Sequence, residues 1–258
     1  MVRHPGNQNV VGHRRLRLMH DPRCRILLLI TLLILGCVDV MAQEGFFQRS
    51  RHAAAFNFGR INHEYVGAAD LIQSYEYQGV AFGLSYIGPQ LRAAGLFART
   101  DDSGTFVDLS ATAWLLPSFV KVERGNTTIA VPIGFLIAWR RVAPGNDVAP
   151  FGANAIMFGG GASLLHSLSQ RARFELRAMP LAGITGSEIA DAVGFSWAVD
   201  SEALVKIADI FSSLGLVIGY TFRYQFWNVN GSTGFSDAVD ELYDYAGSVQ
   251  TISMGIWF

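Results

Sequence analysis

The sequence has 258 residues, of which 50% are hydrophobic and only 16% carry a charged side chain. This length suits one domain or two small ones, and the low charge is unusual for a soluble protein. Residues 1–42 hold six Arg against two Asp, whereas the remainder holds 14 Lys and Arg against 19 Asp and Glu. Because this remainder has no basic patch, nucleic acid is not expected as a partner.

Both cysteines, Cys24 and Cys37, lie in the N-terminal segment. The rest of the chain therefore has no disulfide framework and no thiolate metal site, and we expect neither a metal nor a cofactor. A helical membrane protein needs several apolar runs of about 20 residues. One long apolar run occurs, at 26–35, so the pattern argues against a bundle of membrane helices.

That apolar run belongs to a predicted export signal. Arg23 and Arg25 precede it, and small residues follow it up to Ala42. A basic flank, a short apolar stretch and a small residue at the cut are typical of a secretory signal peptide. The sequence thus predicts a signal peptide over 1–42 and a mature chain over 43–258.

Three alternatives stay open for this segment. The stretch before Met19 is long, so Met19 is a candidate start that leaves a signal of ordinary length. Residues 34–37 resemble a lipoprotein cleavage box ending at Cys37, which would then carry a lipid. The apolar run could instead stay uncleaved as a membrane anchor, although it is too short to span a bilayer well.

After residue 42, apolar side chains recur at every second position, which is the period of a β-strand. Gly88 and Pro89 predict a tight turn between two strands. Pro132 interrupts another stripe and predicts a bulge, because proline cannot donate a hydrogen bond to a neighbouring strand. The pattern predicts ten strands, near 52–62, 75–87, 90–99, 105–116, 127–141, 151–164, 171–186, 192–208, 214–227 and 248–258.

The clearest strand is 214–227, whose two faces differ in polarity. The apolar face consists of Leu214, Leu216, Ile218, Tyr220, Phe222, Tyr224 and Phe226. A soluble sandwich buries such a face in its core, and an exported lipid-binding β-sandwich is the alternative fold. The opposite face mixes Gly, Thr, Arg and Gln, which favours a barrel interior, and the aromatic cluster suits a girdle at the membrane surface.

The last segment repeats this stripe. Its apolar face carries Ile252, Met254, Ile256 and Phe258. A terminal Phe preceded by apolar residues at alternate positions, in a chain with an export signal, resembles the C-terminal assembly signal of bacterial outer-membrane β-barrels. The resemblance implies that the protein lies in outer-membrane lipid and is inserted by the barrel-assembly machinery.

These features together predict an all-β fold, a closed antiparallel transmembrane β-barrel of about ten strands, with eight or twelve as alternatives. A sheet in lipid must close on itself, because no water satisfies its edges there. An even strand number places both ends in the periplasm. The longest connection, 228–247, then becomes an outer loop that carries Asp237, Asp240, Glu241 and Asp244.

If the apolar stripes face lipid, a set of charged side chains points into the barrel. This predicted lumen charge network comprises Asp108, Arg140, Arg173, Glu175, Arg177, Asp200, Glu202, Lys206 and Arg223. Charges on the neighbouring strands 171–186 and 192–208 are expected to pair, since bare charges in a confined space are costly. The network is interpreted either as a salt-bridged interior that maintains the barrel shape or as the lining of a narrow polar pore.

Histidines are the natural candidates for catalysis, and the mature segment holds His52, His63 and His166. Some outer-membrane barrels are hydrolases with a Ser–His pair at the outer rim. Ser167 and Ser169 follow His166 but point to the opposite face of a strand. His63 is expected in the first outer loop. We therefore expect solvated or turn histidines and no catalytic residue.

The sequence thus predicts an outer-membrane barrel that is not an enzyme and that serves as a structural envelope component or as a narrow pore for a small solute. A hydrolase with a site at the rim is one alternative. An accessory subunit that contacts an envelope protein through the acidic loop 228–247 is the other.

Overall fold

The computed structural model describes residues 52–66, 76–99, 104–116, 121–143, 151–187, 193–211, 214–230 and 242–258. The chain divides into two units, residues 1–50 and 51–258, and all described residues belong to the second unit. The predicted signal peptide lies outside the described residues, together with Met19, Cys24 and Cys37.

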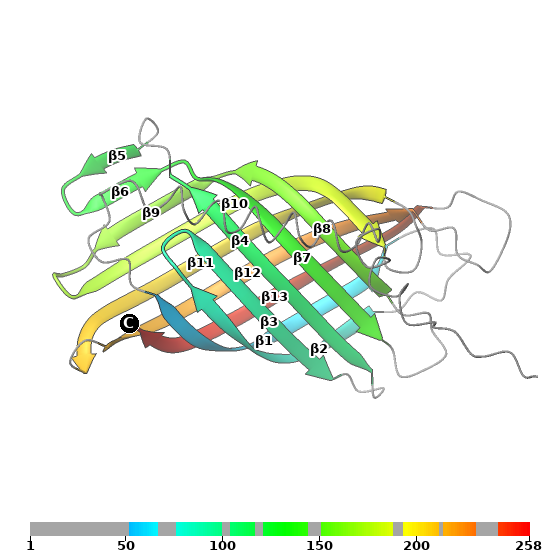
Figure 1. Cartoon of the computed structure of the whole chain (residues 1–258), viewed down its shortest axis with the longest axis horizontal. Helices are drawn as coiled ribbons and strands as arrows, with labels where there is room; N and C mark the ends of the chain where they lie inside the picture. The colour runs from blue at the N-terminus through cyan, green and yellow to red at the C-terminus, as the bar shows by residue number, and fades with distance from the viewer. Residues whose placement is uncertain are drawn as a thin grey trace, which may run out of the picture. The chain divides into compact units, whose positions relative to one another are not determined.

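The described residues form thirteen β-strands, labelled in Figure 1. Their bounds are β1 (Ala53–Tyr65), β2 (Glu76–Ile87), β3 (Leu91–Arg99), β4 (Thr105–Leu115), β5 (Lys121–Arg124), β6 (Thr127–Ala130), β7 (Ile133–Ala143), β8 (Phe151–Gly160), β9 (Ala162–Ser167), β10 (Ala172–Ser187), β11 (Val193–Phe211), β12 (Leu214–Asn230) and β13 (Leu242–Trp257). In the described part of the chain, no helix has the length and apolar character to span a membrane.

Ten of these strands close into a ring. Each strand in the order β1, β2, β3, β4, β7, β8, β10, β11, β12 and β13 pairs antiparallel with the next, and β13 pairs with β1. The register of the ring is offset. If one starts at Ala53 and steps from each residue to its paired residue on the next strand, one full circuit ends at Tyr65, twelve residues further along β1 (from 53 to 65). Such a shift requires strands that tilt against the barrel axis, as Figure 1 shows. The prediction of a closed antiparallel ten-stranded barrel is confirmed.

The two ends of the ring differ. We call the end where Ala53 and Trp257 pair the terminal end, and the end where Tyr65 and Tyr245 pair the loop end. Between β2 and β3, Gly88 donates its backbone N–H to the carbonyl of Leu91 over 2.7 Å. This short connection at the terminal end is the turn that the sequence predicts there.

The wall extends beyond the ring on one side of the terminal end. β6 and β7 follow one another in the chain and are separated only by Val131 and Pro132, which are not in strand conformation. Gly161 separates β8 from β9 in the same way. Gly161 donates its backbone N–H to the carbonyl of Pro132 over 3.0 Å, so the two breaks lie side by side. Beyond them β5, β6, β9 and the first half of β10 form a short sheet, seen in Figure 1 at the end marked C.

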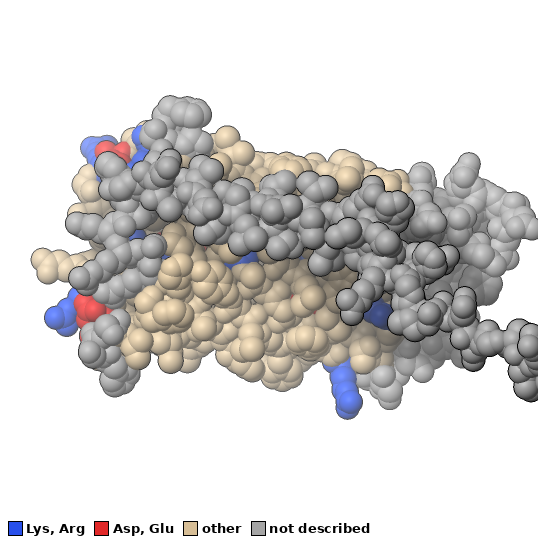
Figure 2. All heavy atoms as spheres, in the orientation of Figure 1, with Lys and Arg blue, Asp and Glu red and all other residues tan. Residues whose placement is uncertain are grey.

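Side chains alternate between the lumen and the outer wall. In β1, Phe56 and Phe58 are about half exposed, whereas Asn57 and Ile61 are buried. The predicted assembly residues Ile252, Met254, Ile256 and Phe258 are all exposed on the outer wall; their role in assembly stays a prediction. Figure 2 shows a broad tan surface, with Asp and Glu atoms visible on this face only toward the terminal end. The alternation puts mostly apolar side chains outside, whereas the inside holds polar and apolar residues together.

The predicted outer loop 228–247 is too long. β12 runs to Asn230 and β13 begins at Leu242, so the hairpin continues on both sides of the predicted boundaries. Asp244 is a strand residue whose carboxylate accepts a hydrogen bond from the Asn228 side-chain amide over 2.6 Å. This pairing extends the hairpin past Phe226, the last residue of the apolar stripe on β12, to positions where the stripe continues with Asn228 and Asn230 and gives no signal. Asp237, Asp240 and Glu241 lie outside the described residues.

Candidate functional site

The lumen near the loop end holds a buried group of charges around Asp108. Arg140 on β7 is the register partner of Asp108 on β4, and its Nε donates to Asp108 Oδ2 over 2.9 Å. Arg223 on β12, from the far side of the ring, donates to the other carboxylate oxygen. One carboxylate thus joins three strands, because closure of the barrel brings the inward faces of β4 and β12 together.

Aromatic rings enclose this group. The guanidinium carbon of Arg140 lies 5.3 Å from the ring centroid of Phe106 and 5.6 Å from that of Trp227. Such contacts offset part of the loss of hydration of a buried cation. Arg140 Nη1 also lies within 3.4 Å of His63 Nδ1.

The structure corrects the predicted position of His63, which is not in a solvated outer loop. Strand β1 extends to Tyr65, and His63 pairs in register with Gly247. Its ring is fully buried and lies 4.6 Å from the ring of Phe151 and 5.5 Å, stacked, from that of Tyr245. The sequence places the end of this strand too early because the alternation weakens after Ile61.

A second group of charges lies nearer the terminal end. Arg177 on β10 donates to Glu202 on β11 over 2.9 Å, and the guanidinium carbon of Arg177 lies 3.4 Å from the ring centroid of Trp114. Arg92 on β3 approaches the same carboxylate, at 3.5 Å. These contacts link opposite sides of the lumen, so Glu202 has the bridging position here that Asp108 has at the loop end.

The remaining members of the predicted network are less tightly held. Lys206 pairs with Glu175 over 2.8 Å, and Asp200 accepts a hydrogen bond from the Thr112 hydroxyl over 3.3 Å. Arg173 occupies an inward register position opposite Lys206 but is exposed. Arg173 is absent from the ion pairs seen among the described residues. The structure therefore brings eight of the nine predicted side chains into polar contact.

Sequence reasoning missed Arg92 and His63 as lumen residues. The segment 91–99 consists mostly of Ala, Gly and Leu at both parities, so its two faces look alike. The register of β3 with β4, in which Arg92 opposes Thr112, assigns the inward face. To assign Arg92 to the lumen, one needs to know which residue of β4 it pairs with, and the residue types in 91–99 do not give this.

Large apolar side chains fill much of the lumen around the charge groups. Ile61, Leu136, Met157, Met179 and Leu204 are buried within the ring. An interior cavity of about 20 Å³ lies beside Asp200, Arg223 and Thr112, which is enough for about one water molecule. The described lumen is therefore packed rather than open.

A larger polar hollow opens at the terminal end. Its volume is about 460 Å³, and it is lined by Arg171, Arg173 and Lys206 together with Ser167 and Trp257, among others. The β9–β10 turn forms one side, where Ser169 Oγ accepts backbone N–H groups of residues 171 and 172. We call this hollow the terminal mouth; it is distinct from the interior cavity beside Asp200.

The other two histidines lie outside the lumen charge groups. His166 on β9 shares a hydrogen bond of 2.8 Å with the hydroxyl of Thr127 on β6. His52 contacts the Tyr86 hydroxyl over 2.5 Å. The described residues contain no group of three or more His, Cys, Asp or Glu that could hold a metal ion. The absence of enzymatic activity stays a prediction.

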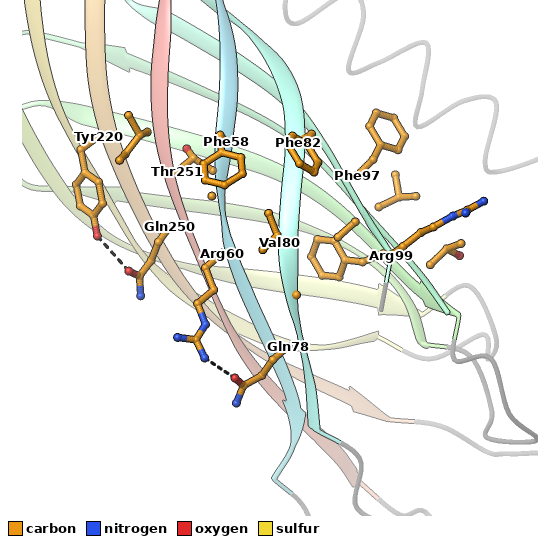
Figure 3. A pocket seen from close by; sticks show the side chains of 17 residues that line it. Phe58, Arg60, Gln78, Val80, Phe82, Phe97, Arg99, Tyr220, Gln250 and Thr251 are labelled. Carbon is orange, nitrogen blue, oxygen red and sulfur yellow. Dashed lines mark hydrogen bonds between the residues drawn. The ribbon is translucent and has the colours of Figure 1, made fainter. Parts of the chain in front are cut away.

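The outer wall carries a hollow of about 1280 Å³ on strands β12, β13 and β1 to β4. Figure 3 shows two hydrogen-bonded pairs along its loop-end side. Arg60 Nη2 donates to Gln78 Oε1 over 2.5 Å, and the Tyr220 hydroxyl donates to Gln250 Oε1 over 3.4 Å. The rings of Phe58, Phe82 and Phe97 lie on the other side of this polar row. The outer wall thus changes from apolar to polar within this hollow.

No protein-family model matches the sequence, and no curated protein matches it. Among solved structures, the outer membrane protease OmpT from Escherichia coli matches 84% of this chain and 98% of its own, with 7% sequence identity and a TM-score of 0.43. The attachment invasion locus protein Ail of Yersinia pestis matches 82% of this chain and 100% of its own, at 8% identity and a TM-score of 0.24. Bacterial outer-membrane β-barrels are thus among the solved structures that resemble this chain across most of its length.

Proposed function

We propose that this protein is an integral β-barrel of a bacterial outer membrane that serves as a structural envelope component with a closed lumen. The observation that supports it is the complete ring of ten antiparallel strands with apolar side chains exposed outside and charged ones buried inside. A closed ring satisfies its own backbone groups, which lipid requires. An exposed apolar wall of this extent would be a liability in water.

The closed lumen follows from its packing. Buried charges pair across the ring through Asp108 and Glu202, and Leu136, Met157 and Met179 are buried in the same interior. An open pore would need a continuous water-filled path, whereas the interior cavity beside both charge groups measures only about 20 Å³. The narrow-pore interpretation of the charge network is therefore the second candidate, supported by the inward charges alone.

Membrane fractionation tests the placement. The full chain, expressed in a Gram-negative host, should sediment with the outer membrane and should migrate differently on gels before and after heating, because a closed barrel resists unfolding in detergent. Recovery in the soluble periplasm would overturn the proposed membrane location.

Planar-bilayer recordings test the closed lumen. The purified barrel should insert without resolved conductance steps. Reproducible single-channel steps from the folded protein would overturn the closed lumen and favour the narrow pore, while leaving the membrane placement intact.

We propose further that the barrel is not an enzyme. Hydrolysis of an envelope lipid or peptide by the purified protein, abolished by His166→Ala, would contradict this.

A further inference from the structure

The hollow on the outer wall carries two cations. Arg60 on β1 and Arg99 on β3 both line it and are both exposed. Within the described part of the chain, the residues that line it include neither Asp nor Glu. The side of the hollow nearest the loop end is therefore positively charged.

Register pairing arranges the polar side chains in a row. Arg60 lies opposite Gln250 on β13 and opposite Val80 on β2. Its guanidinium donates to Gln78, and Gln250 accepts from Tyr220. A guanidinium has five N–H donors, so the contact with Gln78 leaves donors of Arg60 available. None of the described residues that line the hollow supplies a counter-charge for it.

Toward the terminal end the same strands present an apolar surface. Phe58, Phe82 and Ile252 line the hollow and are about half exposed. Phe58 and Phe82 lie 5.3 Å apart between ring centroids. Figure 3 shows these rings and the Arg60–Gln78 pair in one view, on neighbouring strands. The hollow is thus amphipathic along the barrel axis.

We propose that this hollow is a binding site for a membrane lipid with an anionic phosphate headgroup. Arg60 and the amide groups of Gln78 and Gln250 hold the phosphate, Arg99 adds a second positive charge, and an acyl chain lies along Phe58, Phe82 and Ile252. The inference rests on the proposed membrane location. A cation on a lipid-facing wall is costly unless it is paired, and the headgroup provides the counter-charge that the lining residues lack.

Lipid retention measured on the intact barrel tests the site. The folded full chain in micelles is offered equal amounts of phosphatidylglycerol and phosphatidylcholine, and bound lipids are counted by native mass spectrometry. The wild-type barrel should retain phosphatidylglycerol preferentially. Arg60→Gln should lower this preference about fivefold. The double variant Arg60→Gln, Arg99→Gln should lower it by about the square of that factor, because each basic residue adds a similar attraction to an anionic lipid.

Arg141→Gln is the matched control, because Arg141 on β7 is also exposed but does not line the hollow. This variant should keep the wild-type preference. An equal loss in the control, an unchanged ratio in the Arg60 variants, or a dimer that occupies the site in place of lipid would overturn the inference. Failure of the wild-type chain to fold in micelles or to enter membranes would instead count against the proposed function.

Discussion

Arg140 and Asp108 face each other as register partners on β7 and β4, and the Arg140 Nε lies 2.9 Å from Asp108 Oδ2 with both side chains buried. The same carboxylate also accepts a hydrogen bond from Arg223 on β12. A single acidic group therefore pairs with cations from two parts of the chain that are 83 residues apart (from 140 to 223).

Replacing this carboxylate should be strongly destabilising. Asp108→Asn leaves two buried guanidinium groups without a counter-charge, and we expect a loss of about 3–5 kcal/mol in the free energy of unfolding. Urea unfolding of the refolded barrel, followed by tryptophan fluorescence, measures it. Glu123→Gln is the control, because Glu123 is exposed on β5 and should change stability by less than about 0.5 kcal/mol. Similar values for both variants would contradict the bridging role of Asp108.

The outward face should be sensitive to charge in a depth-dependent way. Leu109 on β4 is 44% exposed and lies near the middle of that strand, and Leu109→Arg should destabilise the inserted barrel by about 2–4 kcal/mol. Val193 is also exposed but lies at the loop end of β11, so Val193→Arg should cost about 0–1 kcal/mol. Equal costs, measured by reversible unfolding in lipid vesicles, would mean that this wall does not face the bilayer interior.

The closed lumen predicts which side chains reagents can reach. The background is a variant with Cys24 and Cys37 changed to Ser. In it, we expect Ser110→Cys, beside the interior cavity, to react with a charged methanethiosulfonate reagent at least about a hundredfold more slowly than Ser169→Cys at the terminal mouth. The reagent reaches position 110 only when the barrel opens locally, and such opening is rare in a packed interior. Mass spectrometry of the labelled folded barrel measures both rates. Equal rates would reveal a water-filled passage.

The break between β8 and β9 requires glycine at position 161. A Cβ at Gly161 would lie 1.9 Å from the Ala178 carbonyl oxygen, which is backbone and cannot rotate away. We expect Gly161→Ala to destabilise the barrel by about 1–3 kcal/mol or to prevent folding. At Gly95 the nearest atom would be a flexible Leu109 side-chain carbon at 3.2 Å, so Gly95→Ala should still fold. The fraction of each variant that folds is measured on gels, as the band that changes mobility after heating. A wild-type folded fraction for Gly161→Ala would disprove the close approach.

The sequence alone predicts the strands well, because the alternation of apolar and polar residues has a strict period of two. It can be recognised in one strand without knowing which strand pairs with it. The sequence also predicts the inward parity of Arg177 and Glu202, because each lies on a strand whose opposite face is mostly apolar. The prediction weakens where alternation weakens. His63 and the ends of the hairpin at Asn228 and Asp244 were assigned to loops for this reason, although backbone pairing continues through them.

What only the tertiary structure decided is which inward charges meet across the lumen. Arg223 reaches Asp108, and Arg92 reaches Glu202, because the ring closes with a shift of twelve residues (from 53 to 65) that sets the height of every strand relative to the one facing it. Alternation along one strand carries no information about that height. The sequence therefore determined which face of each strand points inward, and the closure of the barrel determined the partners.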